Sequence, residues 1–213
     1  MELSYKIEQV KPNIFSVTLS DSYHLPMLFC RVQEFYESPN EDFRGKPFSI
    51  WDYMEWYSEF KGSFTYPADW SGFNIPFDVL EECIGVSKIE TPYDSEMVSI
   101  YESIQSMKSE GKAYIIGTED NQGGTFDHEV CHARFCIDEE YKQKALTFVR
   151  SIDVEISERM KQNLLKGGYS DPVIEDEIHA YLMYGHNSKI LSSGINKHKT
   201  NKLHRDIHKI LNS

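Results

Sequence analysis

The chain has 213 residues, 40% of them hydrophobic and 26% charged, which is typical of a folded protein and excludes a disordered one. Its formal net charge of −12 argues against a general nucleic-acid-binding protein, which needs a basic face for phosphate groups, so we expect no nucleic-acid partner. No apolar run approaches the ~20 residues that span a bilayer, and the N-terminal residues are charged where a signal peptide is apolar. We therefore expect a cytoplasmic protein with no membrane partner.

The elements of the N-terminal half follow from hydrophobic periodicity and from turn residues such as those at Lys11-Pro12-Asn13. In chain order we expect strands at 5–10 and 14–19, helices at 24–37 and 49–57, an irregular aromatic segment at 66–76, a helix at 94–110 and a strand at 112–118.

The sequence pattern of the C-terminal half predicts helices throughout. The predicted helices are 125–136, with Thr125 as its N-cap, then 138–150, 153–166, 171–184 and 199–212. The fold class expected is therefore α+β, mostly helical, with a small antiparallel sheet built from the N-terminal strands and the strand at 112–118.

Four cysteines occur without a C-x-x-C pair, and we expect them to be reduced and mostly buried. They are Cys30, Cys83, Cys131 and Cys136.

One short motif points to chemistry. His128-Glu129-Val130-Cys131-His132 matches H-E-x-x-H and falls on the predicted helix 125–136. Residues four apart share one helical face, so the imidazoles of His128 and His132 can converge on one Zn²⁺ per chain. Glu129 lies about 100° further round the helix, beside the metal, where it can take a proton from water.

A catalytic zinc site needs a third protein ligand, and the acidic stretch that follows Pro172 offers candidates. Glu177 lies 45 residues after His132, a separation into which two helices fit before a third returns beside the motif. Glu175 and His179, on the same predicted helix, are rivals, although they also fit a surface pair. Cys131 is interpreted as a core residue.

The stretch from 112 to about 185 resembles the gluzincin group of zinc metallopeptidases, in which a Glu from a second helix completes the ligand set. The resemblance implies His128, His132 and Glu177 as ligands and Glu129 as general base. Many gluzincins carry an Asp four residues after the ligand Glu, where it holds a ligand His; here that position is Tyr181. The resemblance also implies that the strand at 112–118 is the sheet edge that binds a peptide substrate.

A hydrolase also needs a hydrogen-bond donor for the oxyanion, and Tyr181, Tyr184 and His186 are candidates. The pair His204 and His208 has the spacing of the motif without its Glu, and is interpreted as a surface pair.

These features predict a single zincin-like domain over 1–213. Its parts are an N-terminal part at 1–110 of undefined role, a metal-site part at 112–185 and a basic C-terminal helix at 186–213. The function expected is that of a zinc-dependent hydrolase, an intracellular metallopeptidase acting on a peptide or protein substrate. The alternatives are a non-catalytic zinc-binding or protein-interaction module, and a helical binding module in which the motif is a coincidence.

Overall fold

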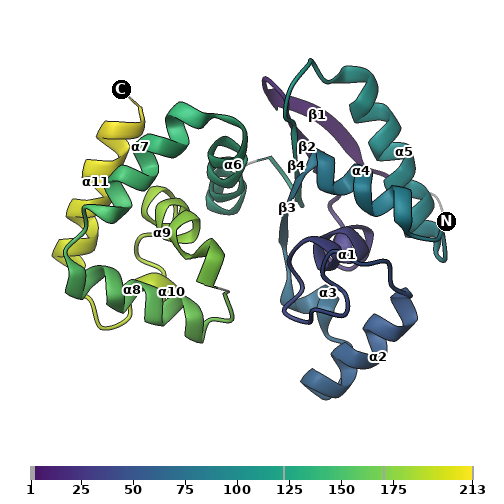
Figure 1. Ribbon diagram of the computed structural model, residues 1–213, viewed down its shortest axis with the longest axis horizontal. Coiled ribbons are helices and arrows are strands. Elements are labelled where there is room, and N and C mark those ends of the chain that lie inside the picture. The colour runs from purple at the N-terminus through teal and green to yellow at the C-terminus, as the bar shows by residue number, and fades with distance from the viewer. Residues whose placement is uncertain (1–2, 122, 170, 213) are drawn as a thin grey trace. The chain divides into compact units, whose positions relative to one another are not determined.

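A computed structural model describes residues 3–121, 123–169 and 171–212. The chain divides into two compact units, Met1–Asn121 and Gln122–Ser213, which are described separately (Figure 1). That the whole chain acts as one zincin-like domain stays a prediction. Among the described residues, no helix is both long and apolar enough to cross a membrane.

The first unit contains a four-stranded sheet in the order β1-β2-β4-β3. Its strands are β1 (Lys6–Lys11), β2 (Ile14–Thr18), β3 (Gly72–Pro76) and β4 (Tyr114–Thr118). The turn between β1 and β2 depends on Asn13, whose backbone is left-handed at φ 55° and whose side-chain amide donates to the Glu110 carbonyl at 3.2 Å.

This sheet confirms the α+β class and corrects three details. The sheet is mixed, because β2 and β4 run parallel while the other two pairs are antiparallel. A parallel pair needs a long crossover, which the helices between β2 and β4 supply. The segment 66–76, expected to be irregular, contains β3, in which Phe73 and Ile75 face the core. Finally, β4 lies between β2 and β3, so it is not the exposed edge expected for peptide binding.

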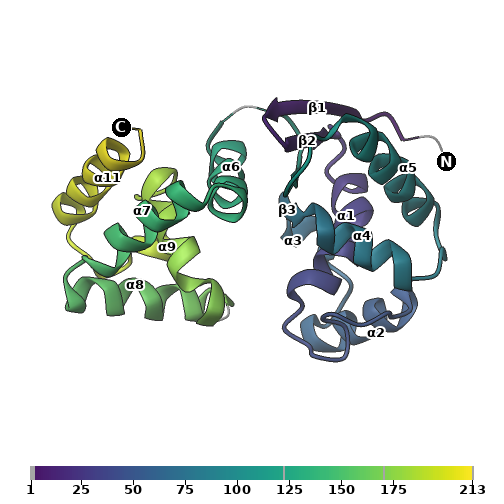
Figure 2. The same ribbon diagram turned by 45° about the horizontal axis from the view of Figure 1, so that its top comes forward.

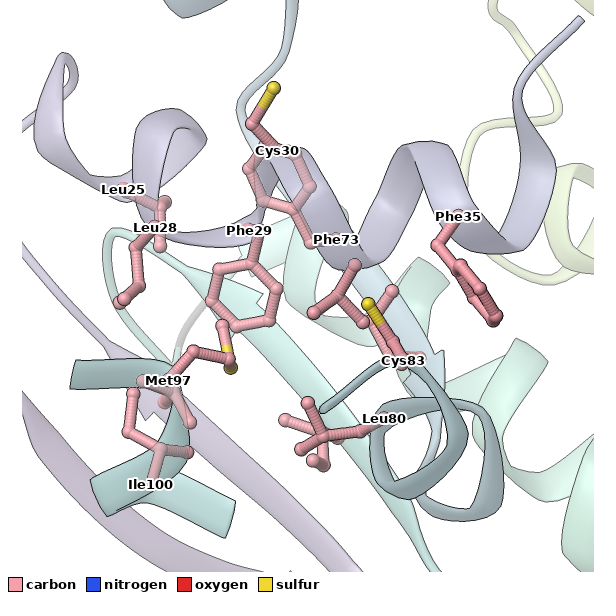
Figure 3. Close-up of a cluster of buried hydrophobic side chains, with 14 of the residues drawn as sticks. Leu25, Leu28, Phe29, Cys30, Phe35, Phe73, Leu80, Cys83, Met97 and Ile100 are labelled. Carbon is pink, nitrogen blue, oxygen red and sulfur yellow. The ribbon is translucent and has the colours of Figure 1, made fainter. Parts of the chain in front are cut away.

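The helices of the first unit surround a core rich in aromatic side chains. They are α1 (His24–Glu37), α2 (Ile50–Lys61), α3 (Tyr66–Asp69), α4 (Phe77–Val86) and α5 (Pro92–Met107). Phe29 of α1 stacks on Phe73 of β3 with ring centroids 5.1 Å apart, as Figure 3 shows at the centre of the buried cluster. Gly117 of β4 leaves the space that the Phe29 ring fills, since a Cβ there would lie 2.5 Å from the ring.

A buried cation ties α1 to α5. Arg31 is 6% exposed, pairs with Asp94 at 2.7 Å and Glu90 at 2.8 Å, and donates to the Phe48 carbonyl. Asp94 also belongs to the capping box with Thr91 that begins α5. The charge of Arg31 is therefore fully compensated.

Every element described in the second unit is a helix or a helical turn (Figure 2). Its elements are α6 (Gly123–Ile137), α7 (Glu139–Arg150), α8 (Val154–Lys166), the 3-10 turn η1 (Asp171–Val173), α9 (Ile174–Met183), α10 (Lys189–Ser192) and α11 (Lys197–Leu211). Helix α9 lies centrally and contacts α6, α7, α8 and α11. Helix α6 begins two residues before Thr125, which is therefore inside the helix and not its cap.

All four cysteines are free thiols, and all but Cys136 are buried, as expected.

Candidate metal centre

Helices α6 and α9 bring the three predicted ligands together. His128 and His132 lie four residues apart on α6, with their Nε2 atoms 3.1 Å apart. Glu177 of α9 places Oε1 3.6 Å from His132 Nε2 and Oε2 3.7 Å from His128 Nε2. All candidate ligand atoms lie within 4.8 Å of one another, so this group could hold a metal ion.

The chemistry of this group fits a divalent cation. Glu177 is 9% exposed, and its buried Oε2 has no hydrogen-bond partner among the described residues. A buried carboxylate oxygen left unpaired is costly, and coordination of a cation removes that penalty. Two imidazoles and one carboxylate are the ligand set of several catalytic zinc sites, which keep a fourth position open.

Asp176 holds the candidate ligand His132. Its Oδ2 lies 3.0 Å from His132 Nδ1, so the ring donates there and turns Nε2 toward Glu177. Burial alone would raise the pKa of Asp176, but His132 and His179 outweigh it and lower that pKa to about 2. The carboxylate partner missing at Tyr181 is therefore present at Asp176, directly before the ligand Glu177, which corrects the sequence-based expectation.

A backbone carbonyl holds His128, the other candidate ligand on α6. His128 Nδ1 donates to the carbonyl of Tyr184 at 3.3 Å, because a carbonyl can only accept. The Nε2 atom of His128 then faces the site. Both histidines are thus oriented for coordination through Nε2.

Without a metal, the same geometry places a proton between the two rings. Both Nδ1 atoms already donate, to Tyr184 and to Asp176, so the hydrogen bond between the two Nε2 atoms, 3.1 Å apart, needs one further proton. The carboxylates around His132 favour a positive charge there, so His132 is the imidazolium. The pKa of His132 supports this protonation state. Burial opposes the positive charge, but Asp176, Glu177 and Glu129 outweigh burial and raise the pKa of His132 to about 10.

The rival third ligands have other partners. Glu175 forms an ion pair with Arg150 at 2.8 Å near the surface. His179 is fully buried, with Nδ1 3.1 Å from Asp176 Oδ1 and Nε2 2.8 Å from the Tyr141 hydroxyl. Burial is the main reason that the pKa of His179 is lowered, so its ring is neutral. Cys131 lies in the hydrophobic core of the second unit, as expected.

Glu129 and two tyrosines, Tyr169 and Tyr181, lie near the candidate ligands. Glu129 follows His128 on α6, is 8% exposed, and contributes to the raised pKa values of Tyr169 and Tyr181, for which burial is the larger cause. The Tyr181 ring packs against His128 at 4.6 Å, and its hydroxyl lies 3.0 Å from that of Tyr169. Sequence reasoning missed Tyr169, because nothing local to the segment between α8 and η1 relates it to the motif.

The other two oxyanion candidates do not join this group. The ring of Tyr184 packs against His208, and His186 stacks on His204 with ring centroids 3.9 Å apart. Tyr184 supports the site only through its carbonyl.

The pair His204 and His208 is not a surface pair. Both rings are half-buried and bond the last carbonyls of α9, His204 to Leu182 at 2.8 Å and His208 to Met183 at 2.9 Å. With the bond from His128 to Tyr184, three consecutive carbonyls at this helix end each accept from an imidazole, which satisfies groups that a helix leaves unpaired.

Searches against protein-family models, curated proteins and solved structures found no match to this chain.

Proposed function

We propose that this protein is a zinc-dependent hydrolase, and specifically a cytoplasmic metallopeptidase that cleaves amide bonds in a peptide or protein substrate. The observation that carries the proposal is the convergence of His128, His132 and Glu177, with both histidines anchored through Nδ1 and Glu129 beside them. The same three ligands and the Glu at the second position of the motif are what the resemblance to gluzincins implies.

The protein's own residues divide the work of hydrolysis. The histidines and Glu177 would hold one zinc ion, which supplies Lewis acidity: it lowers the pKa of water to near 7 and polarises a carbonyl. The Glu129 carboxylate takes the proton of the attacking water and returns it to the leaving amine. Of the paired hydroxyls of Tyr181 and Tyr169, one donates to the other, which leaves one O–H as a donor for the oxyanion.

The leading alternative, a non-catalytic zinc or interaction module, has less support. A structural zinc site is closed by four protein ligands. The described residues bring together only three candidate ligands. Cys131 lies in the hydrophobic core, His179 bonds Asp176, and His186 stacks on His204. A fourth position left open favours catalysis over a structural role.

The substitution Glu129→Gln tests the catalytic role. It keeps the size of the side chain and removes the base, so peptide hydrolysis should fall by about 10²- to 10⁴-fold while bound zinc is retained. Hydrolysis would be followed on a mixed peptide library by mass spectrometry, and zinc by elemental analysis.

Glu175→Gln is the matched control, because it removes a half-exposed carboxylate outside the candidate ligand group and should change neither quantity. Hydrolysis that survives Glu129→Gln, or that is insensitive to a chelator, would contradict the proposal.

A further inference from the structure

The ligand His132 stands at one end of a chain of buried hydrogen bonds that leads away from the metal centre. His132 Nδ1 bonds Asp176 Oδ2 at 3.0 Å, Asp176 Oδ1 bonds His179 Nδ1 at 3.1 Å, and His179 Nε2 bonds the Tyr141 hydroxyl at 2.8 Å. This series of hydrogen bonds runs from α6 through α9 to α7 and so links three helices of the second unit.

The direction of each hydrogen bond is fixed by what each group can do. His179 Nδ1 faces two acceptors, the Asp176 carboxylate and the Asp176 backbone carbonyl, both at 3.1 Å, so it carries the proton. Nε2 of the neutral ring then accepts from the Tyr141 hydroxyl. Asp176 is left accepting from two imidazoles, one on each oxygen, so His179 fixes the rotation of the carboxylate that holds His132.

Core packing alone does not explain these two polar side chains. His179 has no exposed surface and Tyr141 is 3% exposed, in a region where an apolar side chain could fill the same volume. The Phe135 ring stacks on His179 at 5.3 Å, and the Arg134 guanidinium lies 3.8 Å from the centre of the Tyr141 ring. Both Phe135 and Arg134 belong to α6, the helix that carries the motif, and they pack against the two side chains of the hydrogen-bond series that lie beyond Asp176.

We propose that His179 and Tyr141 are positioning residues of the metal centre: they lock the Asp176 carboxylate, which orients His132, and thereby set the affinity of the site for a divalent cation. One turn of α9 thus supplies the ligand Glu177, the carboxylate Asp176 and the residue that holds it. This inference rests on the metal-binding part of the proposed function and is independent of catalysis.

Three substitutions separate positioning from simple packing. His179→Leu keeps a similar volume and removes both hydrogen bonds. His179→Asn keeps a side-chain N–H near the place of Nδ1, and so restores the bond to Asp176 alone. Tyr141→Phe removes one hydroxyl. The control Glu175→Gln changes a residue adjacent to Asp176 that faces Arg150 near the surface.

The readouts are the zinc Kd, measured by chelator competition, the visible absorption bands of the Co²⁺-loaded protein, and the unfolding free energy without metal. We expect His179→Leu to weaken zinc binding by about 10-fold, the lower end of the range typical of losing the direct partner of a ligand, because His179 acts through Asp176. His179→Asn should recover most of this loss, Tyr141→Phe should fall between wild type and His179→Leu, and the control should bind as wild type.

The Co²⁺ bands should shift in His179→Leu and return in His179→Asn. Equal affinities and bands in all variants, while the wild type binds zinc, would overturn this inference and leave the proposed function standing. The inference would also be overturned if the zinc affinities of the variants followed their metal-free unfolding free energies and not the presence of an N–H donor to Asp176. If His179→Leu does not fold, the zinc affinity of Tyr141→Phe tests the inference. A wild-type protein that takes up no zinc would instead overturn the metal site itself.

Discussion

We predict that zinc, on binding at the proposed site, displaces a proton from His132, so that binding depends steeply on pH. In the metal-free site the ring is an imidazolium, because it donates through Nδ1 to Asp176 and through Nε2 toward His128. Coordination needs the Nε2 lone pair. Since the pKa of His132 is raised to about 10, one proton leaves this residue for each zinc bound at neutral pH.

The magnitude follows from that single proton. Between pH 7 and 8.5 the zinc Kd should fall about tenfold for each pH unit, which corresponds to about 1.4 kcal/mol per unit. At pH 7, three units below the pKa, displacement of the proton should reduce the apparent affinity by about a thousandfold, or about 4 kcal/mol. The dependence should flatten only as the pH approaches 10.

Isothermal titration calorimetry in buffers of different ionisation enthalpy counts the protons released. We expect about one proton from His132 per zinc at pH 8 in the wild type, and fewer in Asp176→Asn, which removes the carboxylate that contributes most to raising the pKa of His132. A Kd that does not change between pH 7 and 8.5, or binding at pH 8 without proton release, would refute the imidazolium.

Three further predictions concern stability. Because the folded pKa of His132 is raised above its ordinary value, the stability that this residue contributes to the metal-free protein should be fully present below about pH 6.5 and be lost as the pH rises toward 10, as thermal melts of the wild type and of His132→Ala without metal would show. Arg31→Met should destabilise the protein by about 3–5 kcal/mol in urea unfolding, because Asp94 and Glu90 would lose the buried cation that they share; an effect below about 1 kcal/mol would contradict this. Gly117→Ala should cost about 1–3 kcal/mol in the same assay because its Cβ would meet the ring of Phe29, and a neutral effect would show that the ring moves freely.

Features that depend on local sequence could be predicted. The helix at 24–37 was placed with its observed bounds, because its apolar spacing and the following Ser38-Pro39 act within one segment. The motif fixed His128 and His132 on one helical face for the same reason. Glu177 needed the resemblance to gluzincins, since its approach to the motif depends on the packing of α9 against α6.

Features that depend on pairing between distant segments could not be predicted. Strand β3 has only five residues, with Gly72 and Pro76 at its ends, and it is a strand because it pairs with β4. The parallel pairing of β2 and β4 depends on how the entire segment between these two strands folds back, which no local pattern indicates. The roles of Asp176 and Tyr169 likewise arise from side chains that meet across helices, and no spacing in the sequence encodes those contacts.

The most direct test of the metal centre is the zinc content of the untagged protein, purified without a metal column and measured by elemental analysis. We expect about one zinc per chain in the wild type, its loss in His128→Ala/His132→Ala, and its retention in His204→Ala/His208→Ala, which removes a second pair of the same spacing. A wild-type protein that contains no zinc and takes up none on addition would contradict the metal centre and the hydrolase proposed from it.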